Sequence, residues 1–161
     1  MTQIILARAR EVIANTRIPR PASLADTALV IAGHGTELNP VSRKSIERQV
    51  ELIAAQHLFA EVHSAFLEEQ PRIAQVPSFV SARNIVVVPF FMSDGLHVCE
   101  DIPVLLGERA EVVQARLKAG EWPWPNPMER NGRLIYYSRG VGSEPGIADV
   151  ILERVRAASS L

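Results

Sequence analysis

The sequence predicts a single α/β domain in which about four mostly parallel strands are flanked by helices. Strand-like segments alternate with helix-like segments and no long linker separates them, which is typical of a parallel sheet covered on both faces. The run 28–32 is continuously apolar, as in a strand buried on both sides, and 84–91 contains the strongest β signal in the chain. The length of 161 residues suits one domain with its own core.

The amino-terminal half is expected to contain a helix at 2–15, a strand at 28–32, a helix from 40 to about 56, a strand at 60–67 and a short helix at 71–79. Apolar residues recur at helical spacing in the first of these, with charged residues between them. Asn39 is a suitable helix cap, and Pro40 suits the first helical position. These signals predict helices on either side of the first strand.

The carboxyl-terminal half is expected to contain a strand at 84–91, helices at 101–107 and 110–119, a strand at 133–137 and a closing amphipathic helix at 147–158. Asp101 is a candidate cap for the first of these helices, which ends at Gly107. Trp122 to Pro127 alternates tryptophan or asparagine with proline and predicts a rigid loop.

Composition narrows the classes of function and the expected compartment. A formal net charge of −1 provides no global field that would attract nucleic acid. The single cysteine, Cys99, excludes an internal disulfide and a cysteine metal cluster, and it favours a reducing cytoplasm. The amino end has charges within its apolar stretch, unlike a signal peptide, and no apolar run approaches the roughly 20 residues that cross a bilayer. We therefore expect neither a nucleic-acid nor a membrane partner.

Chemically competent side chains follow each predicted strand at its carboxyl end, where open parallel sheets bind their ligands. These are His34, Glu68 with Glu69, His97 and Arg139. Adjacent residues at a strand end point in opposite directions, so at most one of the two glutamates is expected to line the site.

The two histidines are the strongest candidates for a metal site. His34 is flanked by Gly33 and Gly35, which add no side-chain volume and let backbone or ligand approach closely. Two imidazoles with a carboxylate suit Co²⁺, Ni²⁺, Fe²⁺ or Zn²⁺, and ligand softness does not choose among them. The alternative interpretation of His97 is a turn residue with its ring in solvent. Its expected pairing with His34 argues against this alternative.

Basic residues follow the His34 loop on the helix that starts at Pro40. Lys44 and Arg48 are interpreted as part of a solvated face, whereas Arg43 is within reach of an anionic ligand. Guanidinium groups bind carboxylates through two charge-assisted hydrogen bonds.

At these residues the sequence resembles a known family, the class II chelatases of the CbiX type, which comprise the sirohydrochlorin cobaltochelatases of cobalamin biosynthesis and their sirohaem-pathway relatives. Val30-Ile-Ala-Gly-His-Gly-Thr36 is similar to the family's first-strand motif, and Ala65-Phe-Leu-Glu68 to its second. The longest match runs from Val87 to Pro103 and includes His97. Weaker similarity follows at Tyr136 to Gly142 and at 147–152.

The resemblance implies a chelatase that inserts a divalent cation into a reduced tetrapyrrole with eight carboxylates, with loss of two pyrrole protons. It assigns metal binding and catalysis to His34 and His97, with Glu68 as acidic partner and no organic cofactor. Co²⁺ is the expected metal, with Fe²⁺ and Ni²⁺ as alternatives, and short family members work as homodimers. Arg43, Arg72 and Arg139 become candidates for the substrate's carboxylates.

The chain departs from the short family members in its first 26 residues and in the Trp122–Pro127 loop. We therefore divide it into an amino-terminal helical extension, 1–26, and a CbiX-like chelatase domain, 27–161, with the extension expected either to cover the sheet or to mediate dimerisation. Two other functions stay open. One is a metal or tetrapyrrole carrier that uses the same two histidines without turnover, and the other is a metallohydrolase in which they activate water with Glu68.

Overall fold

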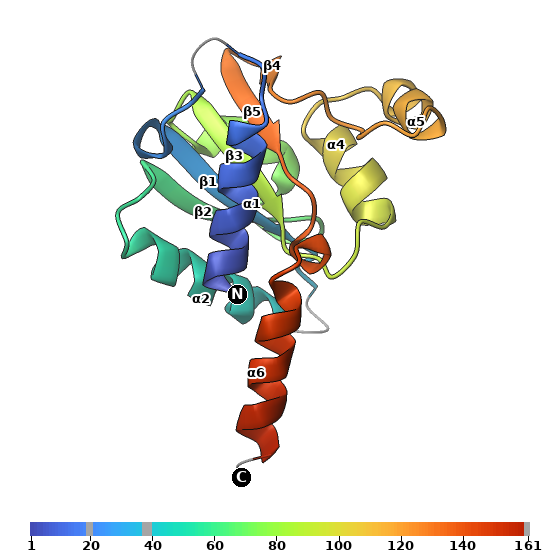
Figure 1. The fold of residues 1–161 in the computed structure, drawn as a ribbon. Helices are drawn as coiled ribbons and strands as arrows, with labels where there is room; N and C mark the ends of the chain where they lie inside the picture. The colour runs from blue at the N-terminus through green and yellow to red at the C-terminus, as the bar shows by residue number, and fades with distance from the viewer. Residues whose placement is uncertain (19–20, 37–39, 160–161) are drawn as a thin grey trace.

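The computed structural model describes residues 1–18, 21–36 and 40–159, which form an α/β fold around one twisted sheet (Figure 1). The sheet contains β1 (Thr27–Gly33), β2 (Glu61–Phe66), β3 (Asn84–Pro89), β4 (Met128–Arg130) and β5 (Arg133–Tyr137). Their order is β2-β1-β3-β5-β4, and every neighbouring pair is parallel except β4 with β5. The mostly parallel sheet that the sequence predicts is confirmed.

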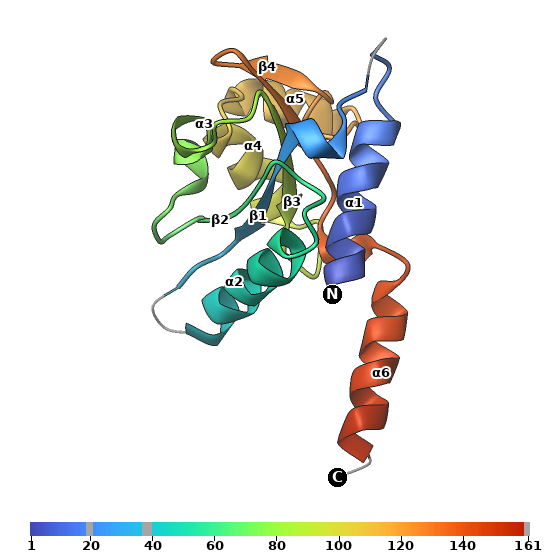
Figure 2. The same ribbon diagram turned by 90° about the vertical axis from the view of Figure 1, so that its left-hand side faces the viewer.

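The helical elements are α1 (Thr2–Ala14), η1 (Leu24–Asp26), α2 (Pro40–Ala54), η2 (Ile73–Gln75), α3 (Val76–Phe79), η3 (His97–Asp101), α4 (Ile102–Leu105), α5 (Ala110–Lys118), η4 (Val141–Ser143) and α6 (Ile147–Ser159). α1 and α2 lie on one side of the sheet and α3 and α4 on the other (Figure 2). The expected cap of α2, Asn39, lies outside the described residues. None of the described helices is long and apolar enough to span a membrane.

The continuous apolar run of β1 is divided between two cores. Leu29 and Ile31 pack in one cluster with residues of α1 and α2, whereas Val30 and Ala32 pack in the other with residues of α3 and α4. All four are completely buried. Since successive side chains of a strand point to opposite faces, a strand covered on both sides needs apolar residues at every position.

The amino-terminal helix belongs to the same folded unit as the sheet. Ile5, Leu6 and Ala9 of α1 are buried in the core cluster that contains β1 and β3. Arg8 is also buried, and its guanidinium donates to the carbonyl of Gly140 at 3.2 Å and to the Ser143 hydroxyl at 2.9 Å. α1 therefore covers the sheet and also ties down the loop that follows β5.

Two of the elements that were not predicted from the sequence bear on the sheet and the site. β4 forms a short antiparallel hairpin with β5 through Asn131 and Gly132, which both have positive φ, 50° and 74°. An Asn-Gly pair between strands is a strong signal for such a hairpin, but the three residues of β4 form too short a run to read as a strand. The second addition is a π-helical turn, η3, which begins at His97 ahead of the expected helix.

Candidate metal centre

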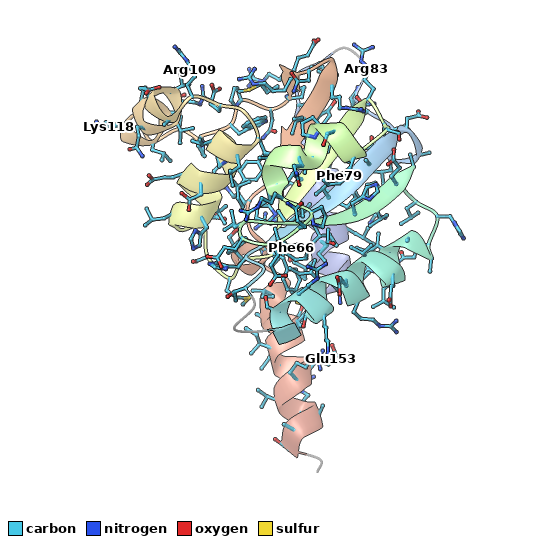
Figure 3. The ribbon with its side chains drawn as sticks, turned by 180° about the vertical axis from the view of Figure 1, so that it is seen from behind. Phe66, Phe79, Arg83, Arg109, Lys118 and Glu153 are labelled. Atoms are coloured by element: carbon cyan, nitrogen blue, oxygen red, sulfur yellow. The ribbon has the colours of Figure 1, made fainter. Side chains whose placement is uncertain are left out.

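His34 follows β1 directly, and the two glycines beside it are required by close packing. A Cβ on Gly33 would overlap the side chain of Ile46, and a Cβ on Gly35 would lie 2.6 Å from the Cβ of Phe66. Phe66 is completely buried and is labelled in Figure 3. Gly35 also has φ of +65°, a conformation that side-chain-bearing residues rarely adopt. The sequence suggested that these glycines let backbone or ligand approach closely, whereas in the structure they make room for the core side chains of Ile46 and Phe66.

Glu68 is brought beside His34 by the backbone. The carbonyl of His34 accepts hydrogen bonds from the N–H groups of Leu67 and Glu68, both at 3.1 Å. Glu69 turns the other way, and its carboxylate forms an ion pair with Arg43 at 2.9 Å. One glutamate therefore faces the site and the other does not, as alternation at a strand end predicts.

His97 starts the π-helix η3, and a carboxylate one turn later orients its ring. Asp101 Oδ2 lies 2.6 Å from His97 Nδ1, which leaves Nε2 of that ring for another ligand. Metal-binding histidines commonly have such a carboxylate partner, because it sets the tautomer and the direction of the ring.

The imidazole rings of His34 and His97 face each other edge to face, with centroids 5.0 Å apart and an interplanar angle of 77°. Nδ1 of His34 is buried without a hydrogen-bond partner and lies 3.8 Å from Glu68 Oε2. Within residues 1–18, 21–36 and 40–159, no group of three or more His, Cys, Asp or Glu side chains is placed to hold a metal ion. The carboxyl edge therefore offers an open pair of imidazoles, with Glu68 near one of them.

The two histidines lie in a cavity of about 510 Å³ with one acidic and one apolar part. Its lining consists of His34, Leu67, Glu68, His97, Glu100, Asp101, Val104, Leu105, Ala110, Val113 and Gln114. The three carboxylates favour a cation near the imidazoles. The aliphatic side chains of α4 and α5 form a wall suited to an apolar ring system.

Glu100, Asp101 and the aliphatic wall were not identified as site residues from the sequence. Asp101 was interpreted as a helix cap, although its position four residues after His97 signals a shared helix face. The amide of Gln114 donates to Glu100 at 2.5 Å and so links α5 to η3. That approach of α5 depends on tertiary packing and has no sequence signal.

The three arginines proposed for substrate carboxylates are not part of this lining. Arg43 is held by Glu47 and Glu69 and covers the ring of Phe66 at 5.0 Å. These carboxylates, Glu69 first, raise the pKa of its guanidinium. Its structural bonds leave it less available to a ligand than the sequence suggested.

Arg72 and Arg139 also lie outside the cavity. Arg72 donates at 3.2 Å to the carbonyl of Leu67, a residue that lines the cavity. Arg139 pairs with Asp94 at 3.2 Å and stacks over Trp122 in a separate hollow. Arg139 therefore does not line the cavity that holds the two histidines, because its side chain is held at Asp94 and Trp122.

Cys99 lies within η3 but is not a metal ligand in character. Burial, together with the negative charge of Asp94, raises the pKa of its thiol. Its Sγ donates a hydrogen bond to the carbonyl of Asp94 at 3.2 Å. A protonated thiol is a poor metal ligand, so Cys99 is a weaker candidate for metal binding than the imidazoles.

Known proteins share the sequence pattern and the fold of this chain. A family profile described as CbiX matches residues 28–158. A probable sirohydrochlorin cobaltochelatase of Halobacterium salinarum is 36% identical over 160 residues, which cover 99% of this chain and 50% of that protein. The sirohydrochlorin cobaltochelatase of Methanopyrus kandleri is 27% identical over 139 residues, which cover 81% of this chain and 96% of that protein. The chain thus spans half the length of the halobacterial relative.

A solved structure shares the fold. CbiX, described as the terminal enzyme for biosynthesis of siroheme in denitrifying bacteria, superposes with a TM-score of 0.65 at 23% identity. The match covers 98% of this chain and 57% of that one. Since the family profile extends from the start of β1 into α6 and includes both histidines, this chain belongs to the CbiX family.

Proposed function

We propose that this protein is a chelatase that inserts Co²⁺ into sirohydrochlorin or a closely related reduced tetrapyrrole, in cobalamin or sirohaem biosynthesis. The observation that carries the proposal is the open pair of imidazoles, 5.0 Å apart, in a cavity with an aliphatic wall. The names of the halobacterial and Methanopyrus relatives support both the metal and the tetrapyrrole. Fe²⁺ and Ni²⁺ are the alternative metals.

Incomplete ligation suits a protein that must release its metal. His34 and His97 hold the incoming ion and leave its other positions to water and then to pyrrole nitrogens, whereas a closed four-ligand site would retain it. Asp101 keeps the His97 ring oriented while its bond to the metal is exchanged.

Insertion of a divalent cation releases two pyrrole protons. The Glu68 carboxylate, beside His34 and half exposed, is the base that accepts these protons in turn and passes them to water. The imidazoles serve as alternative acceptors once they leave the metal.

The cavity also suggests how the macrocycle is oriented. Val104, Leu105 and Val113 contact one face of the ring system, with the metal on its other side. Glu68, Glu100 and Asp101 repel the peripheral carboxylates, which therefore remain outside the cavity. Arg72, bonded to Leu67 of the lining, is the best placed of the three arginines to bind them, and Arg43 and Arg139 remain candidates farther out.

The proposal extends to the organisation of the protein. Residues 27–161 constitute the chelatase domain, and residues 1–26 are an extension whose helix α1 supports the sheet. The free thiol of Cys99 favours a reducing cytoplasm as the compartment. The functional unit is a homodimer, for which the exposed apolar face of α6 is the supporting feature.

The test is spectrophotometric. Purified protein is mixed with sirohydrochlorin and Co²⁺, Fe²⁺ or Ni²⁺, and the change in macrocycle absorption is compared with the rate without protein. Turnover that disappears in His34→Ala and His97→Ala, but persists in the exposed control His57→Asn, supports the chelatase. Metal binding without acceleration contradicts it and indicates a carrier, and hydrolysis without insertion indicates a hydrolase.

A further inference from the structure

α6 is an amphipathic helix that projects away from the rest of the molecule (Figures 1 and 2). None of its described residues is buried. Val150, in its first turn, packs against the core, whereas Ile151, Leu152 and Val155 are 49%, 50% and 56% exposed. Large aliphatic side chains exposed together on one helix mark an interaction surface.

Two adjoining hollows lie beside α6, one along α6 itself and one between α6 and α2. The first, of about 450 Å³, is lined by Met1, Met92 and α6 residues that include Ile147, Ile151 and Val155. The second, of about 410 Å³, is lined by Met1, Lys44, Ser45, Arg48, Gln49, Phe90 and Arg154. Both include Met1 and Arg154, so they form one surface, which we call the α2–α6 groove.

The two sides of this groove differ in character. The α6 side is aliphatic apart from Arg154, whereas the α2 side has the cations Lys44 and Arg48, and neither hollow has an acidic residue in its described lining. Arg48 is paired with Glu51, but Lys44 and Arg154 have no ion-pair partner among the described residues. A fitting occupant therefore has an apolar face and an acidic face.

α6 itself has both of these faces. Its apolar stripe includes Ile147, Ile151 and Val155, at the spacing of one side of a helix. Asp149 and Glu153, four residues apart, form an acidic ridge on the opposite side. An α6 helix from another copy would place its apolar stripe against α6 and its acidic ridge toward Lys44 and Arg48.

We infer that a second copy of this chain docks its α6 in the α2–α6 groove, and that the exchange is reciprocal about a two-fold axis. This names the surface of the homodimer in the proposed function. Docking covers Met92, which is 64% exposed on the segment that connects β3 to His97. The partner copy therefore lies next to the segment that leads to the metal centre.

The experiment measures molar mass by light scattering and sedimentation over a range of protein concentrations, without metal or tetrapyrrole. The wild type is expected to be a dimer. Ile151→Asp with Val155→Asp is expected to give a folded monomer, because α6 contributes no buried residue to the core. Circular dichroism and a cooperative thermal transition verify that the variant is folded.

Charge reversal tests whether α6 of a second copy is the helix that occupies the α2–α6 groove. Lys44→Glu with Arg48→Glu, and separately Asp149→Lys with Glu153→Lys, are each expected to raise the dimer Kd at least about tenfold. Combining all four changes is expected to restore most of the affinity, because opposite charges face each other again. The matched control is Arg109→Glu, just before α5, with Lys118→Glu at its end; both lie far from Glu153 (Figure 3), and the control is expected to leave the Kd unchanged.

A monomeric wild type overturns the inference, and so does a dimer that the α6 substitutions leave intact or that the fourfold variant does not restore. Each of these results is independent of chelatase activity. A wild-type dimer that fails to insert metal contradicts the proposed function and leaves the docking surface supported.

Discussion

Asp101 and His97 form a hydrogen bond of 2.6 Å between Oδ2 and Nδ1, one turn apart in the π-helical segment η3. This bond directs the remaining ring nitrogen of His97 and sets its tautomer. Because Asp101 also lines the cavity, its carboxylate adds negative charge close to the proposed metal position. A residue that the sequence suggested as a helix cap is therefore part of the site.

We expect Asp101→Asn to weaken Co²⁺ binding about 10–100-fold, since loss of such a partner weakens a metal-binding histidine by that order. Calorimetric titration with Co²⁺ measures this change. The matched control is Asp26→Asn, an exposed residue of η1 before the other end of β1. Equal Co²⁺ affinity in Asp101→Asn and wild type would show that Asp101 does not contribute to metal binding.

The two adjacent glutamates allow a second comparison. Glu68→Gln is expected to slow insertion about 10–100-fold, since it removes the proposed proton acceptor beside His34. Glu69→Gln is expected to change the rate less than about threefold, because Glu69 pairs with Arg43 outside the cavity. Initial rates at saturating metal measure both effects. The reverse order would exchange the roles of the two residues.

Gly35 links the position of His34 to the core. Gly35→Ala combines an unfavourable positive φ with overlap on Phe66, so we expect a loss of more than about 2 kcal/mol in unfolding free energy. Gly120→Ala has a similar φ of +72° and no neighbour within 4 Å, and it isolates the conformational cost of about 1–2 kcal/mol. Urea denaturation compares them. Equal losses would show that the loop yields easily to the added methyl group.

Sequence reasoning located the parts of the site that depend on strand ends. His34 and Glu68 directly follow buried strands, and the sharp boundaries of those strands can be read from apolar runs. His97 was located by its place after β3 and by family resemblance, although its π-helical turn was not foreseen. The end of a strand is a local property, so the placement of His34 and Glu68 directly after their strands could be predicted from the sequence.

The rest of the site depends on tertiary arrangement. Val113 and Gln114 reach the cavity because α5 folds back toward η3, and periodicity does not predict that approach. Arg139 follows β5 as predicted, but its side chain stacks on Trp122 and pairs with Asp94. The sequence indicates that the Trp122–Pro127 loop is rigid. It does not indicate that Trp122 lies where Arg139 stacks on it.

The role of the extension in stability can be tested at a completely buried residue. Ile5 is completely buried between α1 and the sheet, so we expect Ile5→Ala to lower the free energy of unfolding by about 2–5 kcal/mol. Arg10→Ala, on the exposed side of the same helix, is expected to change it by less than about 0.5 kcal/mol. Thermal and urea unfolding measure both. A neutral Ile5→Ala would indicate that α1 is dispensable for the stability of the sheet.

The lowered pKa of Glu61 predicts how the free energy of unfolding depends on pH. Burial favours a higher pKa for its carboxyl, but hydrogen bonds from His63 and from the N–H groups of Ala82 and Ser81 outweigh burial, and the pKa lies below its ordinary value of 4.5. The unfolded chain therefore takes up this proton at a higher pH than the folded one. The stabilisation is complete above the unfolded pKa and is lost as pH falls through the folded pKa.

We therefore expect Glu61→Gln to reduce the free energy of unfolding by about 1–2 kcal/mol near neutral pH, since it weakens charge-assisted bonds that connect β2 to the loop before β3. The difference from wild type should shrink as pH falls below 4.5, because the wild-type carboxyl is then protonated as well. Urea denaturation at several pH values across this range measures the free energy of unfolding of the wild type and of Glu61→Gln, with the exposed Glu129→Gln as control. A difference that stays constant with pH would assign the effect of the substitution to packing rather than to the charge of Glu61.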